Sequence, residues 1–178
     1  MAVLTEARRA LPAGTWTLDP VHSTIGFELP YMAGTFRGQF RDVDARLTPD
    51  GLSGTARVAS IDVKDENLAA HLQSPEFFDA ERHPELTFAS TSIERTGDKL
   101  HIGGDITIRG LTRPVELTGT IASPFTDAYG RRRLNVTLET AVDRTDFGLD
   151  WNMPLPNGEP ALQHGVKIVA ELFFVEEA

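Results

Sequence analysis

The chain contains no cysteine. Disulfide bonds, thiolate metal sites and cysteine nucleophiles are therefore excluded, while the redox compartment stays open because either state suits a cysteine-free protein. Long hydrophobic runs are also missing, and no apolar window approaches the roughly 20 residues that a membrane-spanning helix needs. Glu6, Arg8 and Arg9 interrupt the stretch where the apolar part of a secretory signal would lie. If Met1 is the native start, these absences predict a cytoplasmic protein.

Basic residues are scarce. The 178 residues carry 17 Lys and Arg against 26 Asp and Glu, a formal net charge of −9. Nucleic-acid binding needs clustered cations that displace phosphate counterions, so we expect no nucleic-acid partner. The one basic run, residues 131–133, follows Gly130 and is typical of a solvent-exposed hairpin end. The length suits a single domain, which we place at 15–178 after an N-terminal extension over 1–14.

Most of the sequence alternates between apolar and polar residues with period two, which is the pattern of antiparallel strands with one buried face. The first long segment illustrates it, because Ile25, Phe27 and Leu29 share one face. The alternation predicts strands over 23–29, 35–41, 43–47, 52–63, 86–93, 100–108, 114–121, 134–142 and 166–175.

One stretch departs from this rhythm. Residues 66–73 place apolar side chains at helical spacing, with Asp65 available as N-cap. Ser74 followed by Pro75 resembles a second cap with proline at the first helical position, so a further helical turn is expected over 76–79.

The connections carry turn residues. Segments 48–51, 97–98 and 127–130 predict tight reversals between strands. Residues 151–160 contain three prolines and can form neither a helix nor a central strand, so a loop is expected there. About eight or nine antiparallel strands with one helical insert fit either a closed barrel or a two-sheet sandwich, and periodicity does not separate the two.

Four segments, in this order and at this spacing, resemble the YceI-like family of lipocalin-like, polyisoprenoid-binding proteins. They are WTLDPVHSTIGF at 16–27, HLQSPEFFD at 71–79 with the following His83 and Phe88, GDITIRGLTRPV at 104–115, and DRTDFG at 143–148. The resemblance implies an all-β fold, an extended antiparallel β-barrel of about eight strands with a short helical insert. It also implies an apolar tunnel that holds a long isoprenoid or similar lipid. Members of the family differ in ligand, so the resemblance supports the fold more firmly than the ligand.

Two groups of residues suggest catalytic or metal chemistry and are better explained otherwise. The five histidines show no spacing of metal ligands, so we expect turn and surface histidines, without a zinc or haem site or any other cofactor. Ser23 lies beside His22 and near Asp19, but neighbours in one strand point to opposite faces and cannot easily share a proton. Asp19 and Ser23 are expected to satisfy backbone groups where the first strand begins.

Arg144 and Asp146 follow the predicted strand 134–142, at a barrel rim. Two roles are open for them. They form a rim ion pair that ties strand to loop, or Arg144 donates to a phosphate or phenol oxygen of a ligand head group.

The aromatic residues either fill a core or line a tube, and small residues beside them, such as Gly38 and Gly104, favour lining. The predicted function is therefore non-catalytic binding of a long hydrophobic ligand for carriage, storage or sequestration. One rival is an enzyme that isomerises or cyclises a lipid in the cavity; another is a stress protein that absorbs amphiphiles without preference. A homodimer is left open. The predicted ligand-binding residues are Ile25, Phe27, Leu29, Phe36, Phe40, Phe88, Ile106, Ile108, Arg144, Trp151 and Met153.

Overall fold

Antiparallel strands dominate the computed structural model, which describes residues 11–178. Most of the predicted extension over 1–14 therefore lies outside the described residues. The strands are β1 (Trp16–Leu18), β2 (Thr24–Tyr31), β3 (Gly34–Phe40), β4 (Val43–Thr48), β5 (Gly51–Arg57), β6 (Ile61–Asp62), β7 (Glu85–Thr96), β8 (Lys99–Ile108), β9 (Leu111–Ile121), β10 (Phe125–Thr126), β11 (Arg132–Asp143) and β12 (Gly165–Glu176).

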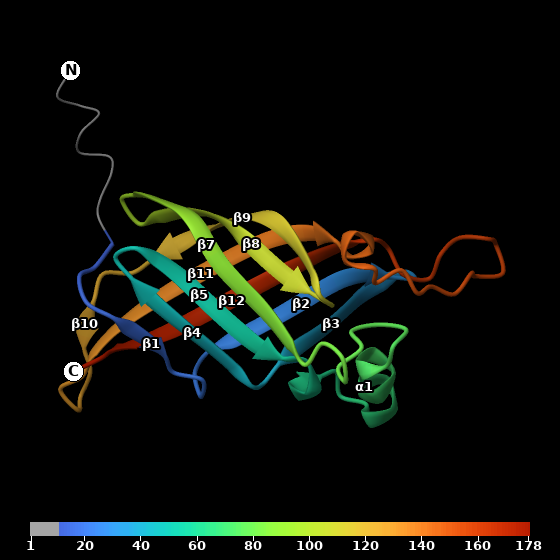
Figure 1. The fold of residues 1–178 in the computed structure, drawn as a ribbon, viewed down its shortest axis with the longest axis horizontal. Coiled ribbons are helices and arrows are strands. Elements are labelled where there is room, and N and C mark those ends of the chain that lie inside the picture. The colour runs from blue at the N-terminus through green and yellow to red at the C-terminus, as the bar shows by residue number, and fades with distance from the viewer. Residues whose placement is uncertain (1–10) are drawn as a thin grey trace, which may run out of the picture.

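These segments occupy eight positions around a closed barrel. β1 and β2 form the first position, because both pair with β12. β3 and β4 form the second, since they pair with β2 and β1 respectively. β5 and β6 form the third, next to β4 and β3. β7, β8, β9, β11 and β12 follow in chain order, and β12 returns to β1 and β2 (Figure 1). The barrel prediction is confirmed, and closure excludes the sandwich.

The strand predictions hold for every long segment, with corrections at the short ones. The stretch predicted as one strand over 52–63 is broken by a 3-10 turn, η1 (Val58–Ser60). The three-residue β1 and the two-residue β10 were not predicted. Turns at 48–51, 97–98 and 127–130 join strands as expected, and 151–160 is a loop with a single isolated bridge, Pro154 to Pro160.

The helical insert begins as predicted, but the second helical turn does not form. α1 (Glu66–Gln73) starts after Asp65, whose Oδ1 accepts a hydrogen bond from Leu68 N at 2.8 Å. After α1 the chain folds back in turns, and Phe78 N donates to Leu72 O at 3.0 Å. Asp79 adopts φ 53°, a left-handed conformation that cannot continue a right-handed helix. Among the described residues, no helix is long and apolar enough to cross a membrane.

The two ends of the barrel differ. α1 and the loop that follows η2 (Arg144–Phe147) lie at one end, called the helix end below, whereas β10 and the C-terminus lie at the other, the β10 end (Figure 1). Trp16, Leu134 and Phe174 are completely buried in the β10 half. That half is a packed core.

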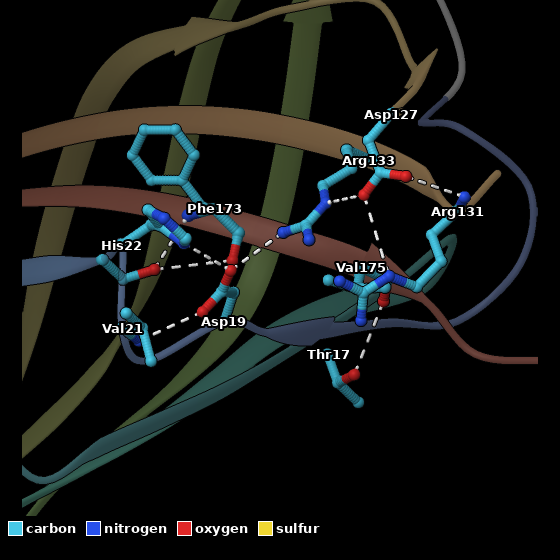
Figure 2. Close-up of polar contacts among 10 residues, drawn as sticks. Thr17, Asp19, Val21, His22, Asp127, Arg131, Arg133, Phe173 and Val175 are labelled. Carbon is cyan, nitrogen blue, oxygen red and sulfur yellow. Dashed lines mark hydrogen bonds and ion pairs between the residues drawn. The ribbon is translucent and has the colours of Figure 1, made fainter. Parts of the chain in front are cut away.

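An ion-pair cluster ties the chain together at the β10 end (Figure 2). Arg133 donates from Nη1 to Asp19 Oδ2 at 2.8 Å and from Nε to Asp127 Oδ2 at 2.7 Å. It thereby links the segment after β1 to the β10–β11 hairpin. The basic run does lie at a hairpin end, but the predicted solvent exposure is wrong for Arg133, whose side chain is 14% exposed.

The same contacts lower the pKa of both carboxyl groups to about 2. Burial alone would raise the pKa of Asp19, but hydrogen bonds from His22, Arg133 and the backbone outweigh it. Hydrogen bonds from Arg133 and from the backbone lower the pKa of Asp127. Both groups therefore stay ionised at neutral pH and hold the hairpin in place.

Candidate ligand-binding cavity

The helix half of the barrel encloses a cavity of about 450 Å³. This volume lies within the range of about 300–1,000 Å³ that is typical of small-molecule sites. Its wall is formed mainly by apolar side chains from β2, β3, β5, β7, β8, β11 and β12, and it is covered by α1 and the loop after η2. The predicted residues on strands all border it, namely Ile25, Phe27, Leu29, Phe36, Phe40, Phe88, Ile106 and Ile108.

The alternation of β2 places its apolar face as expected. Ile25, Phe27 and Leu29 all border the cavity, whereas the side chains of the intervening Thr24 and Glu28 do not. Phe27 is only half-buried, although it lies inside a closed barrel and packs against the core. The exposed part of its ring therefore faces the cavity. This arrangement agrees with lining rather than filling.

Glycines on neighbouring strands make room for two phenylalanine rings. Gly38 on β3 lies directly opposite Phe27, and a Cβ atom there would approach Phe27 Cζ to 2.5 Å. On β8, a Cβ at Gly104 would approach Phe88 Cζ to the same distance. Each ring therefore occupies space that a side chain on the neighbouring strand would fill. Because the rings lie against the wall, the lumen beside them stays open.

The cover over the cavity is aromatic and ends in an exposed rim. Trp151 contacts Phe77 with ring centroids 5.3 Å apart and meets His71 edge-on at 4.9 Å. Met153 borders the cavity, as predicted, although 57% of its surface is exposed, and Met32 in the β2–β3 turn is 58% exposed. Residues that both border the cavity and face solvent mark its mouth, between the β2–β3 turn and the loop.

Arg144 lies at the cavity, immediately after β11, and is only 5% exposed. Its Nε donates to Gln163 O at 2.9 Å, and its Nη1 donates to Trp151 O at 2.9 Å and to Leu149 O. The guanidinium thus holds the covering loop against the barrel. Burial lowers the pKa of Arg144 from its ordinary value, although the nearby acidic charges oppose this effect.

The predicted rim ion pair between Arg144 and Asp146 is wrong. The exposed Asp146 makes no ion pair with Arg144, whose donors turn to backbone carbonyls instead. One nitrogen of the guanidinium, Nη2, is buried and has no hydrogen-bond partner in the part of the chain that the structure describes.

The Ser23 neighbourhood does not form a catalytic triad. Ser23 Oγ accepts from Phe173 N at 2.9 Å and donates to Phe173 O at 3.4 Å, whereas His22 Nδ1 binds Asp19 Oδ2 at 2.7 Å (Figure 2). The hydroxyl and the imidazole are not hydrogen-bonded to each other. Asp19 Oδ1 also accepts from Val21 N at 3.1 Å, so the predicted role of Asp19 and Ser23 in satisfying backbone groups is confirmed. Residues 11–178 hold no cluster of three or more potential metal-ligating side chains.

Comparison with known proteins places this barrel among described relatives. Residues 16–174 match the YceI-like domain family. Protein YceI of Escherichia coli O157:H7 is 29% identical over 140 residues, which is 74% of this chain and 73% of that protein. Burkholderia cenocepacia BcnA shares the fold with a TM-score of 0.73 at 21% identity, over 88% of this chain and 98% of that one. A polyisoprenoid binding domain from Saccharophagus degradans shares it with a TM-score of 0.70 at 10% identity, over 91% and 98%. Because the family match covers almost the whole barrel, the chain belongs to the YceI-like family.

Proposed function

We propose that this chain binds one long hydrophobic ligand, a polyisoprenoid or similar lipid, inside the helix half of its barrel. Binding serves carriage, storage or sequestration, without chemical conversion of the ligand. The observation that carries the proposal is the contrast within one barrel: the β10 half is packed, whereas the helix half keeps an apolar cavity of about 450 Å³. The shared fold of the Saccharophagus degradans domain, which is described as polyisoprenoid-binding, supports the same class of ligand.

Chain length decides whether such a ligand binds. At about 25 cal/mol per Å² of apolar area, a ligand that buries about 500 Å² gains about 12 kcal/mol. Association and ordering of the chain cost about 4–15 kcal/mol. A chain of roughly twenty carbons or more is therefore expected to bind, and one of about ten carbons to bind barely.

Mass spectrometry of an organic extract of the purified protein tests this proposal directly. A recovered long-chain lipid, unchanged after incubation with the protein, supports it; conversion of the lipid to a product would favour the rival enzyme.

Titration of delipidated protein with one head group on chains of increasing length should show affinity that rises with length. Equal affinity for short and long chains would contradict a tunnel. A competition series across lipid classes separates a dedicated carrier from an unselective absorber of amphiphiles.

A matched pair of variants on β12 locates the binding site. Ala170 borders the cavity, whereas Val169, one residue earlier, lies on the outer face of the same strand. Ala170→Phe inserts a ring into the lumen and should weaken binding at least tenfold. Val169→Phe adds the same ring outside and should leave binding unchanged. Equal affinities for the two variants would place the ligand elsewhere.

A further inference from the structure

Arg144 is a buried cation with an unused donor. The residue is 5% exposed, and Nε and Nη1 both donate to backbone carbonyls, while Nη2 has no hydrogen-bond partner among residues 11–178. A buried donor left unsatisfied costs its full desolvation penalty, and the penalty is larger for a charged group. An unpartnered N–H group in a native structure therefore needs an explanation, and an absent ligand is one.

No acidic side chain among the described residues forms an ion pair with Arg144. The Oδ1 atom of Asp143 accepts from the backbone and hydroxyl of Thr145, and Asp150 is solvent-exposed. Two other titratable residues that border the cavity, Glu139 and His71, have partners elsewhere. Glu139 pairs with Lys167 at 3.4 Å, and His71 pairs with Glu76 at 2.6 Å. Arg144 is thus the cation at the cavity that lacks a counter-ion.

We propose that Nη2 of Arg144 donates to an oxygen of the ligand's head group. The ligand is then an amphiphile whose polar head carries a hydrogen-bond acceptor, a carboxylate or a neutral carbonyl, and binds at the helix end. This inference rests on the proposed function. The hydrophobic chain of the ligand runs along the lumen toward Leu138, which borders the same cavity on β11. Arg144 lies six positions after Leu138, so this path is about 20 Å long.

A head-group series on the unmodified protein tests the proposal without disturbing the fold. Three compounds with the same long chain, a carboxylic acid, its primary amide and the hydrocarbon, compete with a fluorescent long-chain probe on delipidated protein. At least one oxygen-bearing compound should bind about tenfold or more tightly than the hydrocarbon, which corresponds to about 1.4 kcal/mol. A preference for the acid identifies an anionic head group, and equal binding of acid and amide identifies a neutral acceptor.

The failures of the two proposals are distinguishable in this series. If the affinity for the hydrocarbon is within about twofold of the affinities for both other compounds, the cavity binds an apolar chain and Arg144 does not contact a head group. The inference is then overturned, and the proposed function stands. If none of the three compounds displaces the probe, the proposed function itself fails, and the inference fails with it.

A pair of arginine variants then assigns the preference to Arg144. Arg144→Lys keeps the charge but loses the forked guanidinium. Arg109 offers a matched control, because it donates to Gly148 O at 2.9 Å and to Pro75 O at 2.7 Å without bordering the cavity. The readout is the ratio of affinities for the oxygen-bearing compound and the hydrocarbon. A merely structural role lowers both affinities together and leaves that ratio unchanged.

We expect Arg144→Lys to reduce the ratio toward one and Arg109→Lys to retain it. A ratio that Arg144→Lys leaves at its original value would make Arg144 only the anchor of the loop and would overturn the proposal. The side-chain ¹⁵N resonances of Arg144 provide a second readout on the unsubstituted protein. They should shift when the oxygen-bearing compound is added and stay in place with the hydrocarbon.

Discussion

The two halves of this barrel share strands and alternation, yet one is filled and the other is hollow. In the β10 half, Trp16 and Phe174 have no exposed surface. In the helix half, Phe27 and Phe88 are only half-buried and border the cavity. Alternation therefore decides which side chains point inward, but it does not decide whether they meet across the barrel.

The difference lies in what faces each large side chain. In the β10 half, Phe174 lies opposite Leu134 on β11 and Leu18 on β1, so large residues meet on both sides. In the helix half, Phe27 lies opposite Ile168 on β12 but opposite Gly38 on β3, and its ring lies over the glycine. We infer that the filled half supplies most of the stability and the hollow half supplies the binding.

The largest effect is expected from a cavity made in the filled half. Phe174→Ala should lower the free energy of unfolding by about 3–5 kcal/mol, because the surrounding core cannot fully collapse. Denaturant unfolding of delipidated protein measures this loss. Phe125→Ala in β10 is the control, since Phe125 is 47% exposed and its removal should cost less than about 0.5 kcal/mol. Similar losses in the two variants would show that the β10 half is not packed as described.

Acid should loosen the β10 end through Asp19 and Asp127. Their pKa values are about 2 in the folded protein against an ordinary value of 3.8, so ionisation stabilises the fold above about pH 4. This stability should be lost as the pH falls from about 4 through 2. Unfolding measured across that range should show a shallower pH dependence in Asp127→Asn. The exposed Asp50, in the β4–β5 turn, provides the control variant.

The contrast between the two halves of the barrel becomes sharper if Asp127→Asn leaves ligand binding unchanged. Asp127 contacts Arg133 at the β10 end and does not border the cavity. Asp127→Asn should therefore lower stability at neutral pH without changing ligand affinity. A change in affinity would mean that the two ends are energetically coupled.

The sequence predicted the long strands and α1, because each has a strong period and a recognisable start or turn. It missed β1, because three residues are too few to show a period before Asp19 and Pro20 interrupt the strand. It wrongly extended the helical insert past Ser74 and Pro75, which resemble a helix start. Contacts with the end of α1 decide that segment instead, as Phe78 N donates to Leu72 O.

The lining of the cavity was predicted in composition but not in geometry. Every predicted ligand-binding residue borders the cavity, because inward-facing positions follow from alternation. The partners of Arg144 did not follow from the sequence. Gln163 lies 19 residues away and accepts through its backbone carbonyl. Because every residue type has such a carbonyl, the sequence gives no sign of this contact. The extent of the cavity also depends on which residues meet across strands, such as Phe27 and Gly38.

A smaller effect on stability is expected from the hollow half. Phe27→Ala should cost the delipidated protein about 1–2 kcal/mol, because part of the removed ring already faced the cavity. Ligand affinity should change clearly, since the ring forms part of the wall. Unfolding and binding must be measured separately for this reason. A loss of about 3–5 kcal/mol with unchanged binding would mean a filled core and would erase the contrast with Phe174→Ala.

The smallest effect on stability, and the most selective one on binding, should come from adding a single methyl group at Gly38. The new Cβ would approach Phe27 Cζ to 2.5 Å and Val63 Cγ1 to 2.9 Å, so the Phe27 ring must swing into the lumen. The open cavity allows that movement, and Gly38→Ala should cost only about 1 kcal/mol, the low end for overpacking. The displaced ring narrows the lumen, so ligand affinity should fall. Gly165→Ala is the matched control, because its Cβ would meet nothing within 4 Å. If Gly38→Ala costs several kcal/mol instead, the ring has no space to enter, and the helix half is as full as the β10 half.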